Sequence, residues 1–304
     1  MENVIAIVGP TAIGKTKISI ELAKRLGFEI ISGDSVAVYK ELDIGSAKPT
    51  KEEMDGVPHH LIDILEPTMQ YDVSTFQAEA RKIIYDKHNV IICGGTGLYI
   101  QSVLYDYKFD ASKRELSFEE QFKGYSNEEL YDYLLKLDEN IDREKIHPNN
   151  RKRVLRAIEI YKDTNHSVSN QNALKRPIFN SYVIYLNVSD RDTLYNRINK
   201  RVDKMIEMGL IDEVKALYDK KIYPHAIGYK ELLPYFDGKI SLETAIEDIK
   251  KDSRHLAKRQ MTWFRNQMPT HFYEVNLNNI CETIDTIYND IIKFLGGNKE
   301  WIFI

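Results

Sequence analysis

The sequence is poor in cysteine and has no long apolar segment. Cys93 and Cys281 are too few and too far apart for a disulfide framework or a cysteine metal cluster, which favours a reducing compartment. No apolar run approaches the ~20 residues of a membrane span, so we expect no membrane partner. An apolar run begins within the first few residues, which argues against a signal peptide. These absences predict a cytoplasmic protein, which we expect to be a monomer.

The chain also lacks a large excess of charge of either sign, since its formal net charge is −4 over 304 residues. This total argues weakly against a nucleic-acid partner, although local stripes of lysine and arginine matter more. A hydrophobic content of 43% and a charged content of 29% are typical of a globular protein. The length allows one domain with an insertion.

A phosphate-loop pattern, G-x-x-x-x-G-K-[ST], follows the first apolar run, Val4–Val8. The apolar spacing from Ile18 to Leu26 then predicts a helix. A strand, a glycine-rich loop and a helix in this order direct backbone N–H groups toward one anion, so we expect a di- or triphosphate here rather than an ordinary tight turn. Lys15 would add positive charge, and the Thr16 hydroxyl could hold Mg²⁺. The motif leaves open whether the phosphate is an energy source, a phosphoryl donor or a leaving group.

Two further segments follow predicted strands. Asp34 comes just after the apolar run 28–32, where open α/β sheets place their ligands, although an N-cap or turn aspartate is the alternative. An amphipathic helix, 75–85, leads to the strand 90–93, and Gly94–Tyr99 is a second glycine-rich turn. Its helix N-terminus would lie beside that of the phosphate loop, although a close-packed turn is the alternative. The segments 43–49 and 57–63 have no helical period and are expected to be ordered loop.

From about residue 110 the composition shifts to helical patterns without strands, at 127–137 and 150–161. A strand pattern returns at 182–186. We therefore predict an α/β fold with a P-loop-type parallel sheet core flanked by helices, formed by residues 1–110 and 177–304. Residues 111–176 would form a helical insertion domain. Its second helix is basic, which indicates either a nucleic-acid contact or a solvated face.

Two later helices carry arginine and lysine at helical spacing. Arg197 and Arg201 share one face of the predicted helix 192–208, which suits a diphosphate, although surface ion pairs with Glu207 and Asp212 are the alternative. In the predicted helix 242–265 a buried stripe contains Ile249, Leu256 and Trp263. A basic stripe on another face is a candidate for phosphate-backbone contact and contains Lys251, Arg254, Lys258 and Arg265. The last strand is predicted at 272–275.

The motifs occur in one order that resembles the isopentenyl-tRNA transferase family, the bacterial tRNA dimethylallyltransferases, over nearly the whole chain. The Lys-Arg-Gln-x-Thr-Trp-Phe-Arg end is the most specific of them. Ile13 stands where the family usually has serine. The stretches that carry the resemblance are Gly9–Thr16, Asp34-Ser35, Asp43–Pro49, Gly94–Tyr99, His147–Ala157, His225–Lys230 and Ala257–Arg265.

The resemblance implies transfer of a dimethylallyl group from its diphosphate to N6 of the adenine just 3′ of the anticodon in tRNA. The phosphate loop would then hold a leaving group, with Mg²⁺ near Thr16, and Asp34 would be the general base. The implied catalytic residues are Asp34, Lys15, Thr96 and Arg197. The implied diphosphate-binding residues are Gly9, Pro10, Thr11, Ala12, Ile13, Gly14, Lys15, Thr16, Arg197 and Arg201. The implied tRNA-binding residues are Asp34, Ser35, Val36, Ala37, Thr96, Lys152, Arg153, Val154, Leu155, Arg156, His225, Gly228, Tyr229, Lys230 and Lys258, with Arg114 as a further candidate.

Three rival functions share some of these features. An adenylate-type isopentenyltransferase would act on free AMP, but it would need neither the basic insertion helix nor the basic C-terminal helix. A P-loop small-molecule kinase would use Asp34 on a substrate hydroxyl and an arginine-rich lid. A nucleotide-gated RNA-binding module would bind without catalysis.

Overall fold

The computed structural model describes residues 1–107, 109, 116–168, 176–277 and 279–296. It divides into two compact units, Met1–Tyr105 with Pro177–Ile304, and Asp106–Arg176. The first boundary thus lies after Tyr105, where the composition suggested residue 110. Arg114 lies outside the described residues. Among those residues, no helix is both long and apolar enough to cross a membrane.

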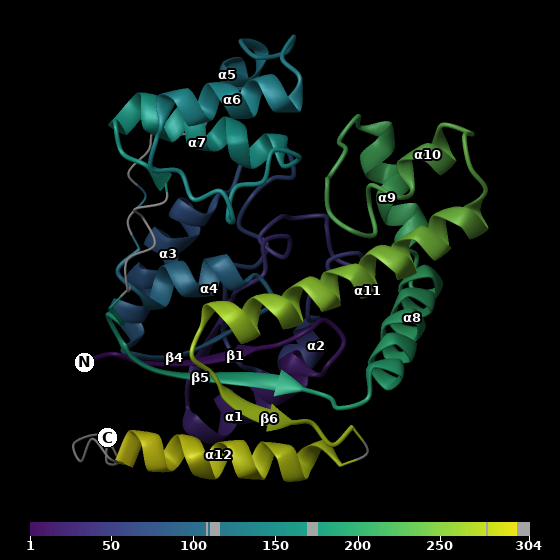
Figure 1. Ribbon diagram of the computed structural model, residues 1–304. Coiled ribbons are helices and arrows are strands. Elements are labelled where there is room, and N and C mark those ends of the chain that lie inside the picture. The colour runs from purple at the N-terminus through teal and green to yellow at the C-terminus, as the bar shows by residue number, and fades with distance from the viewer. Residues whose placement is uncertain (108, 110–115, 169–175, 278, 297–304) are drawn as a thin grey trace. The chain divides into compact units, whose positions relative to one another are not determined.

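The larger unit is built on a six-stranded sheet in the order β3-β2-β4-β1-β5-β6, with every neighbouring pair parallel. Figure 1 shows β1 between β4 and β5. Parallel strands bring their carboxyl ends to one edge, so the segments after β1, β2 and β4 meet there. The α/β fold class predicted from the sequence is therefore confirmed. The strands are β1 (Asn3–Val8), β2 (Glu29–Ser32), β3 (His59–His60), β4 (Asn89–Gly94), β5 (Asn180–Asn187) and β6 (His271–Glu274).

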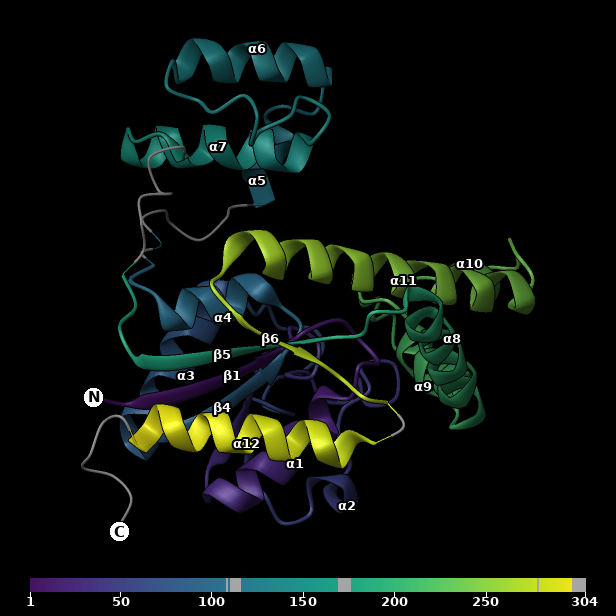
Figure 2. The same cartoon turned by 60° about the horizontal axis from the view of Figure 1, so that its bottom comes forward.

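Helices cover both faces of this sheet (Figure 2). Because side chains alternate along a strand, Ile5 and Ile7 pack in one apolar cluster with α1 and α12, while Val4 and Ala6 pack in another with α3 and α4. This double burial explains why Val4–Val8 of β1 is a continuous apolar run. The helices of this unit are α1 (Lys15–Leu26), α2 (Lys51–Met54), α3 (Val73–Lys87), α4 (Gly97–Leu104), α8 (Arg191–Glu207), α9 (Leu210–Asp219), α10 (Leu233–Phe236), α11 (Leu242–Gln267) and α12 (Ile280–Gly296).

A third apolar cluster lies beside the carboxyl edge of the sheet, where α9, α10 and the first half of α11 pack together. Leu42 and Tyr229 belong to it. The segments 43–49 and 57–63 are largely loop as expected, although the second contains β3, and α2 lies between them. The short helix α2 forms because Thr50 and Glu53 make a reciprocal capping box.

The smaller unit consists of α5 (Leu116–Glu120), α6 (Asn127–Leu137) and α7 (Arg151–Thr164). A capping box of Ser126 and Glu129 starts α6, and the Asn150 side chain caps α7. The two longer helices agree with the helical patterns of the sequence. They enclose their own apolar cluster, which contains Leu130, Leu134, Val154 and Ile158.

Candidate active site

The phosphate loop joins β1 to α1 at the carboxyl edge of the sheet. Gly14 caps α1 with φ 105°, in the left-handed region that glycine adopts without strain. This conformation lets α1 begin at Lys15, with its N-terminus and the loop beside the cavity described below. The partial positive charge of a helix N-terminus favours an anion there.

Lys15 is folded back onto the loop that carries it. Its Nζ donates to the carbonyl oxygens of Gly9 and Pro10, at 3.0 and 2.8 Å. Burial lowers the pKa of Lys15 to about 8, and the positive charge of Arg201 acts in the same direction, while Cys93 and Asp34 oppose it. An anion bound beside the ammonium would therefore stabilise its charged form and offset the cost of burial.

A cavity of about 1060 Å³ opens at this edge of the sheet. It is lined by the phosphate loop, the segment after β2, the turn after β4, α8 and the turn before α10. Residues assigned from the sequence to different roles thus share one site. Of those residues, the ones that line it are Thr11, Ala12, Gly14, Lys15, Thr16, Asp34, Ser35, Val36, Ala37, Thr96, Arg197, Arg201, His225 and Gly228.

Asp34 is both a turn residue and a cavity residue. Its Oδ1 accepts hydrogen bonds from the backbone N–H of Val36 at 2.8 Å and of Ala37 at 3.3 Å. Its Oδ2 has no hydrogen-bond partner in the described part of the chain. The turn therefore fixes the carboxylate through one oxygen and leaves the other available in the cavity, so the two interpretations of Asp34 are compatible.

Arg197 and Arg201 reach the phosphate loop from α8. The Nε of Arg197 donates to the carbonyl oxygen of Ala12 at 3.1 Å, and a terminal nitrogen of Arg201 donates to the hydroxyl of Thr11 at 3.0 Å. In the described residues neither arginine forms an ion pair with Glu207 or Asp212. Two guanidinium groups beside the loop make this end of the cavity strongly positive.

Several residues assigned to binding lie outside the cavity. The Ile13 side chain is fully buried in the apolar cluster of α1 and α12, which suits an apolar residue where serine is usual. Tyr229 is also fully buried, and its hydroxyl donates to Glu213. Lys230 pairs with Asp252. Gly9 and Pro10 are also outside the lining and contribute the carbonyl groups that hold Lys15.

The basic stripe on α11 is shorter than its spacing suggested. Lys251 and Lys258 are exposed, but Arg254 donates to Asn199 of α8 at 2.6 Å and Arg265 contacts Asn187 of β5 at 3.4 Å. Arg254 is half-buried, whereas Arg265 is exposed although it contacts Asn187, so three of the four basic side chains remain exposed. Lys258 lines a smaller hollow of about 240 Å³, together with Arg191 and Arg265.

In the smaller unit, the basic residues of α7 divide into exposed and engaged side chains. Lys152 and Arg153 are exposed. Arg156 forms an ion pair with Glu159 at 2.5 Å. Val154 and Leu155 are buried in the core of this unit, so their side chains support the helix rather than face a ligand.

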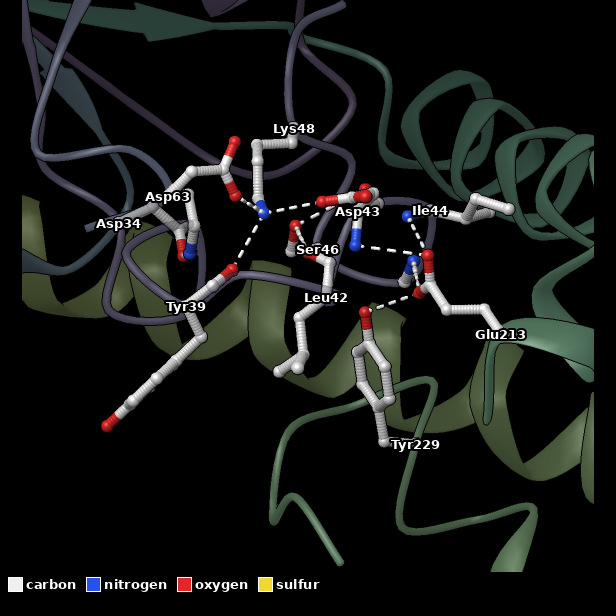
Figure 3. A network of polar contacts seen from close by, with 12 residues as sticks. Asp34, Tyr39, Leu42, Asp43, Ile44, Ser46, Lys48, Asp63, Glu213 and Tyr229 are labelled. Carbon is white, nitrogen blue, oxygen red and sulfur yellow. Dashed lines mark hydrogen bonds and ion pairs between the residues drawn. The ribbon is translucent and has the colours of Figure 1, made fainter. Parts of the chain in front are cut away.

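The sequence analysis did not identify the polar network that holds the segment 42–48 (Figure 3). Glu213 accepts hydrogen bonds from three backbone N–H groups of this segment, at 2.8–3.1 Å, and from the Tyr229 hydroxyl at 2.6 Å. The buried Lys48 ammonium pairs with Asp43 and Asp63 and donates to the Tyr39 carbonyl. The whole of the segment 42–48 lines the cavity, so this network shapes one wall of the site.

The sequence model of the IPP transferase family matches residues 37–267, a span that includes the cavity wall formed by 42–48, both arginines of α8 and the whole of α11. The chain belongs to the IPP transferase family. A tRNA dimethylallyltransferase of Anoxybacillus flavithermus is 48% identical over 97% of each chain. This membership confirms the resemblance drawn from the motifs, and the chain is a prenyltransferase.

Solved structures of IPP transferases agree with this assignment. The tRNA isopentenylpyrophosphate transferase of Bacillus halodurans is 43% identical, with a TM-score of 0.74 over 99% of each chain. A eukaryotic dimethylallyltransferase described as acting on tRNA is 29% identical, with a TM-score of 0.83 over 96% of this chain and 80% of that one.

Proposed function

We propose that this IPP transferase moves a dimethylallyl group from dimethylallyl diphosphate to N6 of the adenine just 3′ of the anticodon in tRNA, and releases diphosphate. The observation that supports this most directly is that Asp34 and the phosphate loop line the same cavity. A base for the attacking amine and a binding loop for the leaving diphosphate thus lie in the same cavity.

An exocyclic adenine amine is a weak nucleophile because its lone pair is delocalised into the ring. As N6 attacks C1 of the dimethylallyl group, Oδ2 of Asp34 accepts the proton that the nitrogen loses. The C1–O bond breaks at the same centre, and its electron pair leaves with the diphosphate. The developing charge meets the phosphate-loop N–H groups, the Lys15 ammonium and the Arg197 and Arg201 guanidiniums.

The cavity also constrains how the nucleic acid enters. A base paired or stacked in the anticodon arm cannot reach the Asp34 carboxylate, so the target adenine must leave its stack. Exposed basic side chains on α7 and α11 would supply contacts to the phosphate backbone of the arm. The residues with this role are Lys152, Arg153 and Lys258. We expect the enzyme to act as a cytoplasmic monomer.

A magnesium ion would fit beside the phosphate loop. In the described residues no group of three or more acidic, histidine or cysteine side chains gathers around a possible metal position. Mg²⁺, however, usually takes only one or two protein oxygens and completes its shell with water and substrate phosphates. The Thr16 hydroxyl in the cavity lining is such a donor, and the ion would neutralise charge on the leaving diphosphate.

The direct test is incubation of the protein with labelled dimethylallyl diphosphate and unmodified tRNA, followed by nucleoside analysis. We expect label in N6-prenylated adenosine at the position 3′ of the anticodon. Addition of AMP should not reduce the labelling, whereas an anticodon stem-loop should compete. Labelled AMP would instead support the adenylate-type enzyme, and ATP consumption without prenyl transfer would support a kinase.

The pKa of Lys15 predicts how diphosphate binding depends on pH. Burial lowers this pKa to about 8, so Lys15 is mainly protonated below that pH and loses its positive charge as the pH rises through it. We expect the Kd for dimethylallyl diphosphate to rise above about pH 8, by at most roughly tenfold per pH unit. Titrations from about pH 7 to about pH 9.5 measure this. Lys15→Arg, whose charge persists, should flatten the alkaline rise, and a wild-type Kd constant over this range would contradict the assignment.

Lys258→Ala is expected to weaken tRNA binding and to flatten its dependence on salt, because one phosphate contact is lost. The slope of log K against log salt should fall in magnitude by about 0.7 to 0.9. Binding measured at several salt concentrations checks this. Lys293→Ala is the matched control, since Lys293 is an exposed lysine on α12 whose side chain pairs with Asp290. An unchanged slope for Lys258→Ala would remove this part of α11 from the interface.

A further inference from the structure

Gln260 joins the two glycine-rich loops of the site. Its Oε1 accepts a hydrogen bond from the backbone N–H of Thr11 in the phosphate loop, at 2.9 Å. Its Nε2 donates to the carbonyl oxygen of Gly95, in the turn after β4, at 3.2 Å. One carboxamide thus contacts both the diphosphate cradle and the turn that contains Thr96, and it lies in the cavity lining.

The two hydrogen bonds of Gln260 form a bridge between the loops, and the residues at both ends of this bridge are themselves held by other contacts. On α11, Met261 and Phe264 are anchored in the two apolar clusters on opposite faces of the sheet, which fixes the helix that carries Gln260. The Thr11 hydroxyl is held from the other side by Arg201. Gly95 permits the contact, because a Cβ at this position would lie 2.1 Å from Nε2 of Gln260.

We infer that Gln260 is a positioning residue for prenyl transfer. It sets the spacing between the phosphate loop and the Gly94–Thr96 turn, and thereby aligns the departing diphosphate with the carbon that N6 attacks. This inference rests on the proposed function. Displacement requires the reacting atoms to be about 3–3.5 Å apart and in line, so a small shift of one loop lowers the rate much more than it lowers binding.

Gln260→Leu removes both hydrogen bonds with little change in size. We expect kcat for prenyl transfer to fall roughly 10- to 100-fold, while the Kd values for dimethylallyl diphosphate and tRNA change less than about threefold. Gln267→Leu, a neutral replacement of an exposed glutamine at the end of the same helix, is the control and should leave both quantities unchanged. A Gln260→Leu enzyme with kcat within twofold of wild type would overturn the inference.

Gln260→Glu provides an independent readout. The ionised carboxylate can still accept from Thr11 but repels the Gly95 carbonyl, whereas the protonated carboxyl can again accept at one oxygen and donate at the other. The ratio of variant to wild-type kcat should therefore rise from about pH 8 to about pH 5. A pH-independent ratio would contradict the bridge.

The outcomes also separate this inference from the proposed function. If wild-type protein forms no prenylated adenosine, the proposed function fails. If wild-type protein forms it and both Gln260 variants behave like wild type, only the positioning role fails. If Gln260→Leu does not fold, the pH ratio of Gln260→Glu decides.

Discussion

Asp34→Asn is expected to lower kcat for prenyl transfer by about 10²- to 10⁴-fold, the range typical of a general base. The amide oxygen can still accept from the N–H groups of Val36 and Ala37, so the turn should persist. The amide cannot accept the proton of the adenine amine. Single-turnover prenylation measures the loss, and filter binding should show tRNA affinity near the wild-type value.

Asp34→Ala provides the comparison, because it removes the turn acceptor together with the base. We expect it to lose at least as much turnover as Asp34→Asn. A fall of less than about tenfold in both variants would show that another group accepts the proton. A large loss in Asp34→Ala with near-normal Asp34→Asn would assign the residue to the turn alone.

The largest effect on stability is expected for Glu213→Ala, which removes the acceptor for three backbone N–H groups and for the Tyr229 hydroxyl. The hydroxyl belongs to a fully buried side chain and cannot turn to solvent. Hydrogen bonds to a charged group contribute about 1.5–3 kcal/mol each, but part of this network is exposed. We therefore expect the free energy of unfolding to fall by roughly 3 kcal/mol, as measured by urea denaturation.

A double-mutant cycle with Tyr229→Phe isolates the buried part of this effect. Tyr229→Phe alone should cost about 1 kcal/mol, because Glu213 keeps its backbone donors. In the Glu213→Ala background the same change should be neutral or stabilising, since it removes an unsatisfied hydroxyl. Additive losses would mean that the hydroxyl and the carboxylate do not interact in solution.

The sequence predicts the parts of the site that depend on local pattern. The phosphate loop and Asp34 each follow a buried strand within a few residues, so the parallel sheet alone brings them together. Glu213 and Gln260 could not be found in this way, because their main partners are backbone groups far away in the chain, which have no side-chain signature. The helix that carries Glu213 did leave a signal, since Leu210, Val214 and Leu217 recur at helical spacing.

The α11 stripe shows a second limit of sequence periodicity. Spacing correctly places Arg254 and Arg265 away from the most buried positions of the helix. It does not indicate that Asn199 of α8 and Asn187 of β5 approach that side and engage both guanidiniums. Which element covers a helix face depends on the tertiary arrangement, so a charge pattern gives an upper limit to the surface available for RNA.

The chain enters and leaves the insertion through two segments that lie side by side, at Tyr105 and Pro177. Tyr105 forms an antiparallel bridge with Pro177, and on either side of it the N–H of Ile178 donates to Leu104 and that of Asp106 to Arg176, each at 3.0 Å. The segment between Tyr105 and Pro177 is therefore a loop whose two ends are held together at the sheet. The conformational entropy lost in closing such a loop grows only slowly with its length. Insertions or deletions within it can accumulate during evolution without displacing β4 or β5, so the part that we propose contacts RNA can diversify while the catalytic core stays constant.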